Sequence, residues 1–160
     1  MTVNTKTVTG RRKVHYENLN ELLADAERLS EGEVTLIGNW SRGKIFGHIS
    51  RSLNFSIDGF PFKVNWAIRM IAKLFMKKKF LTKPLPAGFQ IPEKNQPDFV
   101  PENDDTEQGL AELREAIQRF QDEPTRVKHA ILGELTAEEW EQFHCRHAEM
   151  HMSFIVPANE

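Results

Sequence analysis

Residues 136–155 read TAEEWEQFHCRHAEMHMSFI, and this stretch predicts the best-defined helix of the chain. Thr136 and Glu139 have the spacing of a capping box, in which each side chain accepts a hydrogen bond from the backbone amide of the other residue. We expect the helix to run from this cap to about Ile155, because Pro157 then stops it. The helix therefore carries three histidines, at positions 144, 147 and 151.

The three histidines fall in the apolar sector of this helix. At about 100° per residue they project within about 60° of one another. The side chains that project to the same side are those of Trp140, Phe143, Phe154 and Ile155. Burying an imidazole without a hydrogen-bond partner costs about 1–3 kcal/mol. A core-facing histidine cluster therefore needs a physical reason, and a bound metal ion would supply one.

His147 and His151 are one helical turn apart, so both can reach a single ion. His48 is the only other histidine on an apolar face of a predicted helix, which makes it the candidate third ligand. Three neutral imidazoles would leave positions open for water or substrate, as in a catalytic rather than a closed structural site. The alternative is that the histidines serve the core, since most pairs with this spacing bind nothing.

Other residues are candidates for the surroundings of this site. His144 would be a spare group, either behind the ligands or at the lip of the pocket, and Trp40 is a candidate pocket residue. His129 either lines the pocket or fixes a loop by a hydrogen bond. Cys145 points about 140° away from Trp140, which indicates a packed or half-exposed thiol and not a ligand.

The same helical arithmetic places Glu149 on the solvent side of the last helix, where it would be a poor general base. His15 lies in a polar N-terminal segment, and we expect its side chain to be exposed. Neither residue is therefore a candidate for chemistry.

Three further helices are predicted from caps and apolar periodicity. The first begins near Asn18 or Asn20 and ends at Gly32; the second begins at 39–41 and ends at Gly59; another begins at 104–106 and ends before Pro124. Residues 82–101 contain five prolines and are expected to form a long loop. Residues 34–37 are too short and isolated to predict a strand. The fold class is therefore all-α, with a helical bundle as the natural architecture.

An additional helical segment is expected at about 62–79. Its apolar stripe consists of Val64, Ala67, Ile68, Ile71, Leu74 and Phe75. Trp66 and Met70 lie opposite this stripe and suggest a second buried surface, such as a subunit contact. The run 77–79 of three lysines could bind phosphate or an anionic membrane, but cations at a helix C-terminus are favourable through the helix dipole. We take the dipole as sufficient explanation for the run.

Length and composition predict one domain over residues 1–160, with residues 1–15 flexible or extended. The chain has 21 basic and 23 acidic residues, so its total charge favours no class of partner. Between residues 41 and 83, however, the sequence has ten basic residues and only one acid, Asp58. One cysteine excludes internal disulfides, and no stretch resembles a signal peptide or a membrane span of about 20 apolar residues. We therefore expect a soluble cytoplasmic protein.

Two motifs carry a resemblance to a known superfamily. Residues 40–49, WSRGKIFGHI, followed far downstream by the spacing of His147 and His151, resemble the DinB-like superfamily of bacterial metal-binding bundles. Residues 129–136, HAILGELT, leading into the last helix, are similar to an uncharacterised branch known only as a domain of unknown function. The resemblance implies an up-and-down four-helix bundle, a divalent ion (most often zinc or nickel), ligands at His48, His147 and His151, and frequent homodimers.

Characterised relatives in the superfamily include thiol-dependent transferases and isomerases. The resemblance therefore implies a metalloenzyme that activates a bound water or a low-molecular-weight thiol, with a small molecule or thiol as its partner and no nucleic acid. His144 and the proline-rich loop depart from the common pattern, so a specific substrate does not carry over. The alternative is a non-catalytic bundle that binds a metal, a ligand or a partner protein.

Overall fold

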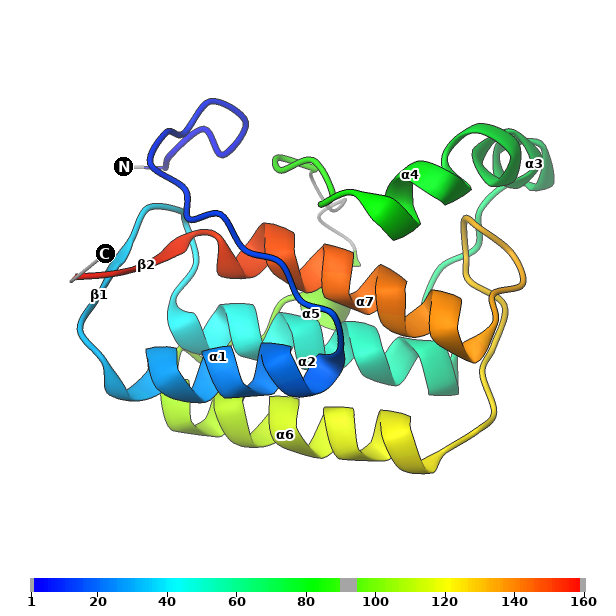
Figure 1. Ribbon diagram of the computed structural model, residues 1–160. Helices are drawn as coiled ribbons and strands as arrows, with labels where there is room; N and C mark the ends of the chain where they lie inside the picture. Colours follow the sequence, from blue (N-terminus) through cyan, green and yellow to red (C-terminus); the bar gives the residue numbers. More distant parts are fainter. Residues whose placement is uncertain (1, 90–94, 159–160) are drawn as a thin grey trace.

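The computed structural model describes residues 2–89 and 95–158. These residues form seven helices and one small antiparallel sheet, so the predicted helical character is confirmed (Figure 1). The elements are α1 (Leu19–Glu31), β1 (Val34–Leu36), α2 (Arg42–Asp58), α3 (Trp66–Phe75), α4 (Lys77–Thr82), α5 (Gln96–Phe99), α6 (Thr106–Asp122), α7 (Ala137–Met152) and β2 (Ile155–Pro157).

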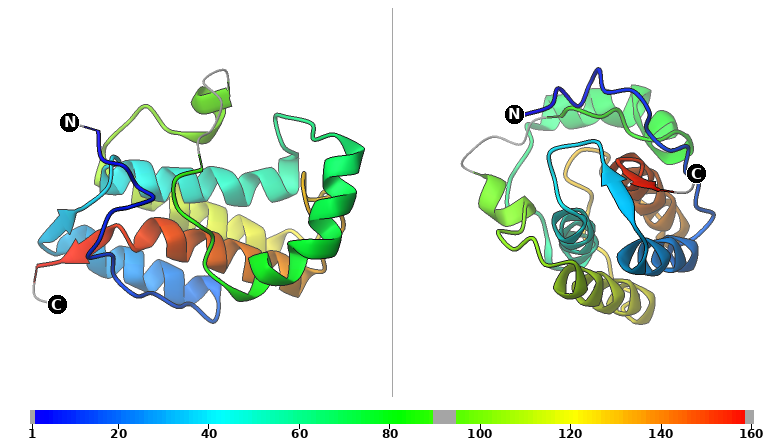
Figure 2. Two further views of the ribbon diagram at one scale, coloured as in Figure 1. Left: turned by 90° about the horizontal axis from the view of Figure 1, so that it is seen from above. Right: turned by 90° about the vertical axis from the view of Figure 1, so that its left-hand side faces the viewer.

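The four longest helices, α1, α2, α6 and α7, lie side by side and enclose the core (Figures 1 and 2). The largest fully buried side chains include Trp140, Phe46 and Leu113, one from each of α7, α2 and α6. Helices α2 and α6 approach each other closely where Gly109 lies against Gly43. A Cβ atom at Gly109 would lie 2.5 Å from the carbonyl oxygen of Gly43, so any larger residue there would push the two helices apart.

The predicted helix starts are confirmed by their caps. Asn18, Ser41 and Asp105 each accept a hydrogen bond from a backbone amide in the first turn of α1, α2 and α6. Thr136 and Glu139 form the complete capping box at the start of α7. These local signals work because they satisfy amides that no helix can satisfy internally.

The last helix ends earlier than predicted, and the sequence analysis missed both strands. After Met152 the chain leaves the helix, and β2 pairs antiparallel with β1, so that Leu36 lies opposite Ile155. Phe154 and Ile155 are buried although they are not helical. These two residues are apolar because they are buried in and before a strand, not because they continue the helix. Their apolar character happened to fit the helical period, so the sequence analysis placed the end of the helix too late.

The segment predicted as one helix over 62–79 is two helices that meet at Met76. Asn65 caps α3, which ends at Phe75, and α4 begins at Lys77. The predicted apolar stripe does not face the core: Ala72 is the only residue of α3 that is buried. Instead α4 packs against α7, while α3 projects from one end of the molecule (Figures 1 and 2).

The proline-rich segment 82–101 is less irregular than predicted. Thr82 is the last residue of α4, and residues 96–99 form the short helix α5, in which Pro97 occupies one of the first two positions. Proline is tolerated there because the first amides of a helix have no internal partner. Pro92 lies outside the described residues. Helix α5 matters for the site because its last residue, Phe99, contacts a histidine of α2.

The N-terminal segment runs along α7 before α1 begins. The side chain of Arg11 donates hydrogen bonds to the Ser153 hydroxyl at 2.7 Å and to the Met150 carbonyl at 3.2 Å, and the backbone amide of Arg12 donates to the Ser153 carbonyl at 3.0 Å. Tyr16 is buried. The segment therefore covers a side of α7 that would otherwise face water.

Candidate metal centre

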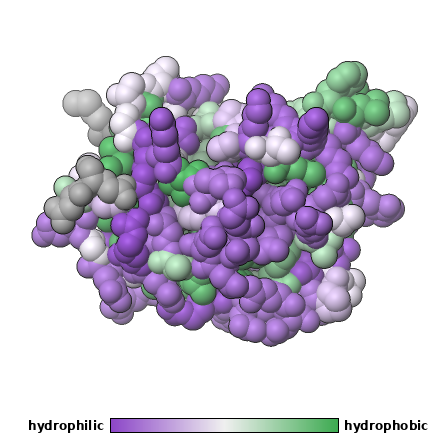
Figure 3. Space-filling view, viewed as in Figure 1, coloured by the Kyte–Doolittle hydropathy of each residue, from purple (hydrophilic) through white to green (hydrophobic). Residues whose placement is uncertain are grey.

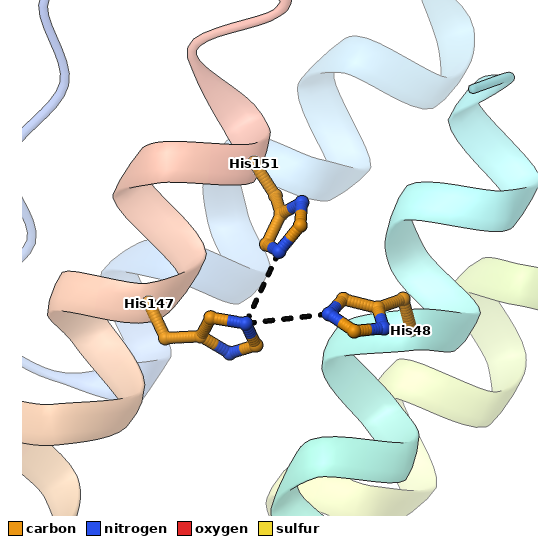
Figure 4. Close-up of side chains that lie close together, drawn as sticks. All are labelled: His48, His147 and His151. Atoms are coloured by element: carbon orange, nitrogen blue, oxygen red, sulfur yellow. Dashed lines mark hydrogen bonds between the residues drawn. The ribbon is translucent and has the colours of Figure 1, made fainter. Parts of the chain in front are cut away.

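Three histidines from two helices converge on one point. His48 projects from α2, and His147 and His151 project from consecutive turns of α7 toward it (Figure 4). The Nε2 atom of His147 lies 3.3 Å from Nε2 of His48 and 3.1 Å from Nε2 of His151. One ligand atom from each residue lies within 4.8 Å of the other two, and no carboxylate or thiol joins this group among the described residues.

The tautomer of His48 is set by α5. Its Nδ1 atom lies 2.8 Å from the carbonyl oxygen of Phe99, which can only accept, so Nδ1 carries the proton. Neutral His48 therefore presents the lone pair of Nε2 to the other two histidines. Because a metal-bound histidine usually donates its second N–H to an oxygen in this way, His48 is prepared as a ligand.

The spacing of the three nitrogens fits a metal ion. Two ligands at about 2.1 Å from a tetrahedral ion lie about 3.4 Å from each other, close to the distances that separate His147 from its neighbours. In a neutral histidine, Nε2 carries either the proton or a lone pair. Nε2 of His147 therefore cannot donate a hydrogen bond to one partner and accept one from the other. The donor set thus fits a cation better than it fits mutual hydrogen bonding.

Burial keeps the three imidazoles neutral. Desolvation lowers the pKa of His48 to about 4, and it lowers the pKa values of His147 and His151 well below their usual 6.5. The neighbouring histidines add to the lowering for His147 and His151, because a second positive charge nearby is unfavourable. All three rings can therefore ligate at neutral pH without first losing a proton.

The three histidines differ slightly in burial. His48 is buried, whereas His147 and His151 are partly buried. Trp40 forms a wall: its ring stacks on His151 with centroids 5.3 Å apart and lies 5.0 Å from His48. Trp40 thus contacts two of the three histidines, and its role in a pocket stays a prediction.

His144 and His129 lie outside the three-histidine cluster. His144 is buried between Trp140 and Phe120, and neither of its ring nitrogens has a protein partner. His129 accepts hydrogen bonds at Nδ1 from the amides of Ile131 and Leu132, so it fixes the loop before α7. The structure therefore places His144 in the core and gives His129 the loop-fixing hydrogen bond.

The predictions for Cys145 and Glu149, on the side of α7 away from the histidines, had different outcomes. Cys145 is fully buried, which confirms a packed thiol, and burial raises its thiol pKa to about 12. Glu149 was predicted on the solvent side, and that prediction is wrong, since only 1% of the residue is exposed. Its carboxylate pairs with Arg146 at 2.6 Å and accepts from the Tyr16 amide at 2.8 Å. The helical arithmetic could not anticipate that the N-terminal segment covers this face.

The buried histidines predict an acid-sensitive metal-free protein. Desolvation lowers the pKa of His129 to about 4 and that of His144 to about 3, whereas both titrate near 6.5 in the unfolded chain. Below pH 6.5 the unfolded state therefore binds more protons, and stability falls as the pH falls toward 4. We expect each of these two histidines to lower the free energy of unfolding by about 2 kcal/mol when the pH falls from 7 to 5.

Urea unfolding in the presence of EDTA at pH 7 and pH 5 measures this loss. The variant His144→Leu should show a smaller difference between the two pH values, because one titrating group is gone. Equal stability of the wild-type protein at both pH values would contradict the expectation.

Comparison with known proteins gives a family and no activity. The model of one protein family, described as "Protein of unknown function (DUF1569)", matches residues 8–158. No curated protein matches the chain, and no solved structure matches it. The family match spans α1 through β2 and includes all three converging histidines.

Proposed function

Because the chain belongs to this family of unknown function, we propose a function from the site itself: a divalent-metal-binding protein that acts as a metalloenzyme on water or a low-molecular-weight thiol. The proposed ion is zinc or nickel, held by His48, His147 and His151. We also propose that α1, α2, α6 and α7 form a DinB-like up-and-down four-helix bundle, and that the protein is cytoplasmic and homodimeric.

The observation that carries the proposal is the convergence of three neutral imidazole nitrogens from two helices, with no fourth ligand from the described residues in the group. A structural metal site is closed by four protein ligands, whereas a catalytic one keeps a position free. Here two ligands lie on one helix and the third is oriented by the Phe99 carbonyl, so the donor set is held by the packing of α2, α5 and α7.

The chain's own groups limit the chemistry. Bound there, a divalent ion would supply Lewis acidity, which lowers the pKa of a water or thiol toward neutrality. Cys145 cannot serve as the nucleophile, since it is buried outside the cluster and its thiol pKa is about 12. The nucleophile must therefore come from solvent. Trp40 would cover one side of the cluster and present an aromatic face to the incoming molecule.

Two measurements on the purified, untagged protein test the proposal. Elemental analysis should find about one equivalent of a transition metal. The metal-loaded protein should then turn over a thiol with an electrophile, or hydrolyse an activated ester, at rates that fall when the metal is removed. If no metal is retained even after reconstitution, the enzyme reading fails together with the site.

The second candidate is a non-catalytic metal- or ligand-binding protein. It is favoured because no carboxylate of the described residues belongs to the three-histidine group, and a carboxylate commonly acts as the general base in metal-assisted hydrolysis. One equivalent of metal with no turnover of thiols or esters would favour this candidate.

A further inference from the structure

Helix α3 turns its large apolar side chains toward solvent. Six of its ten residues are large, apolar and exposed, and we call them the α3 apolar surface: Trp66, Ile68, Met70, Ile71, Leu74 and Phe75. Trp66 and Leu74 are each 72% exposed and Phe75 is 78% exposed. In Figure 3 apolar residues gather on a projecting knob at the upper right, where Figure 1 shows α3. An apolar cluster of this kind on a soluble protein marks a contact surface.

The sequence that contains this surface is strongly cationic. Residues 59–92 contain seven lysines and arginines and no acidic residue. On the helix, Arg69 and Lys73 project within about 60° of Trp66, so positive charge borders the apolar sector. Lys73, Lys78 and Lys79 have no ion-pair partner within 4.0 Å among the described residues, whereas Lys77 pairs with Glu139 at 2.8 Å.

The helix dipole no longer accounts for the three lysines. That explanation required a helix that ends at Lys79, but α4 begins at Lys77. Lys77 and Lys78 thus lie in the first turn of α4, where the positive end of the dipole disfavours cations, and Lys79 lies in its last turn. The dipole therefore does not explain Lys77 and Lys78, and most of the positive charge of the run is unpaired, which favours an anionic partner.

We propose that α3 and the lysines that follow it dock on the surface of an anionic lipid bilayer. A short helix with an apolar sector and a basic flank is the type that lies in the interface, with its apolar side chains among the acyl chains and its cations at the headgroups. An exposed tryptophan suits that boundary because its ring is both apolar and polar.

A second copy of the chain fits this surface less well. A twofold contact through this surface would bring two copies of the same basic flank into one interface, where their like charges repel each other. The α3 apolar surface also projects as a knob (Figure 3), and a bilayer can admit projecting side chains without a matching groove. Charge and shape therefore both favour the bilayer.

Flotation of the whole purified protein with vesicles tests the proposal. We expect it to float with vesicles of phosphatidylcholine and phosphatidylglycerol, to float much less with phosphatidylcholine alone, and to be released by added salt, since salt screens exposed charges. Trp66 emission should shift to the blue on binding. The variant Trp66→Phe should lose that shift and still float.

Two double variants separate the apolar and charged contributions. Leu74→Gln with Phe75→Gln, and Lys78→Glu with Lys79→Glu, should each weaken vesicle binding by about tenfold or more. These side chains are exposed, so both variants should keep the helical spectrum and melting temperature of the wild type. The control is Lys13→Glu with Arg114→Glu, which reverses two exposed charges away from α3 and should bind almost normally.

Several outcomes would overturn the proposal. Failure to float with either type of vesicle would do so, as would equal weakening by the control. A dimer that is lost in the Leu74→Gln, Phe75→Gln variant, without vesicle binding by the wild type, would assign the surface to a second copy. None of these results depends on whether the histidines bind a metal, so the proposed function and the membrane proposal can fail separately.

Discussion

Replacing His147 with alanine is expected to remove the metal while leaving the protein folded. Its Nε2 atom is the central one of the three, 3.3 Å from Nε2 of His48 and 3.1 Å from Nε2 of His151. Its loss therefore leaves only two histidine nitrogens to hold the ion. Metal affinity should fall by about a hundred- to a thousandfold, because one ligand contributes about a quarter of a typical binding free energy. Competition with a chromophoric chelator measures this change.

The fold should persist because the core does not depend on the cluster. Trp140, Phe46 and the leucines around them are buried at other positions of the helices. Circular dichroism and a melting curve should therefore resemble those of the wild-type protein treated with EDTA. His48→Ala should behave in the same way as His147→Ala.

The matched control is His15→Ala, since the His15 side chain is 59% exposed and lies outside the cluster. It should retain the full equivalent of metal. If His147→Ala kept its metal, the three histidines would not be the ligands. If it unfolded, the ion would be structural and not an added reactive centre.

Replacing Arg146 with alanine is expected to be the most destabilising of the changes considered. Arg146 and Glu149 form an ion pair at 2.6 Å, with only 8% and 1% of the two residues exposed. Arg146 also donates to the Tyr16 carbonyl, and Glu149 accepts from the Tyr16 amide at 2.8 Å. Without Arg146 the carboxylate stays buried beside a half-exposed His15 at 3.1 Å. The expected loss is about 3–5 kcal/mol, because a buried charge is left uncompensated.

Urea unfolding at pH 7 measures this loss, and two variants control for it. Arg114→Ala removes an ion pair of similar length with Glu27, but both side chains are about half exposed, so it should cost less than about 1 kcal/mol. Arg146→Met combined with Glu149→Leu removes both charges and should recover much of the stability. Equal effects of Arg146→Ala and Arg114→Ala would show that the buried pair has no special role.

The sequence predicted helix starts better than helix ends. Asn18, Ser41 and Thr136 mark their helices because a cap acts within a few residues and needs no other part of the fold. The end of α7 depended on a partner distant in sequence: Ile155 leaves the helix to pair with Leu36 on β1. No local pattern records that pairing, and the two strands were missed.

The site shows the same division. The spacing of His147 and His151 predicted that they could reach one point, and His48 was identified by its place on an apolar helical face. The three nitrogens meet only because α2 packs against α7. The position of the proton on His48 depends on the Phe99 carbonyl of α5, and no sequence signal indicated that contact. Metal binding by this cluster stays a prediction.

By itself, the sequence of this protein determined its helical character, the starts of its long helices and the histidines that can share an ion. These features rest on caps and periodicity, which act over a few residues. Only the tertiary structure decided which faces are covered. Glu149 is buried because the N-terminal segment lies over α7. The α3 apolar surface is exposed because, of the two neighbouring helices α3 and α4, only α4 packs against the body of the molecule. A helical period reports that a face is apolar but not what lies against it, since that depends on contacts between distant parts of the chain.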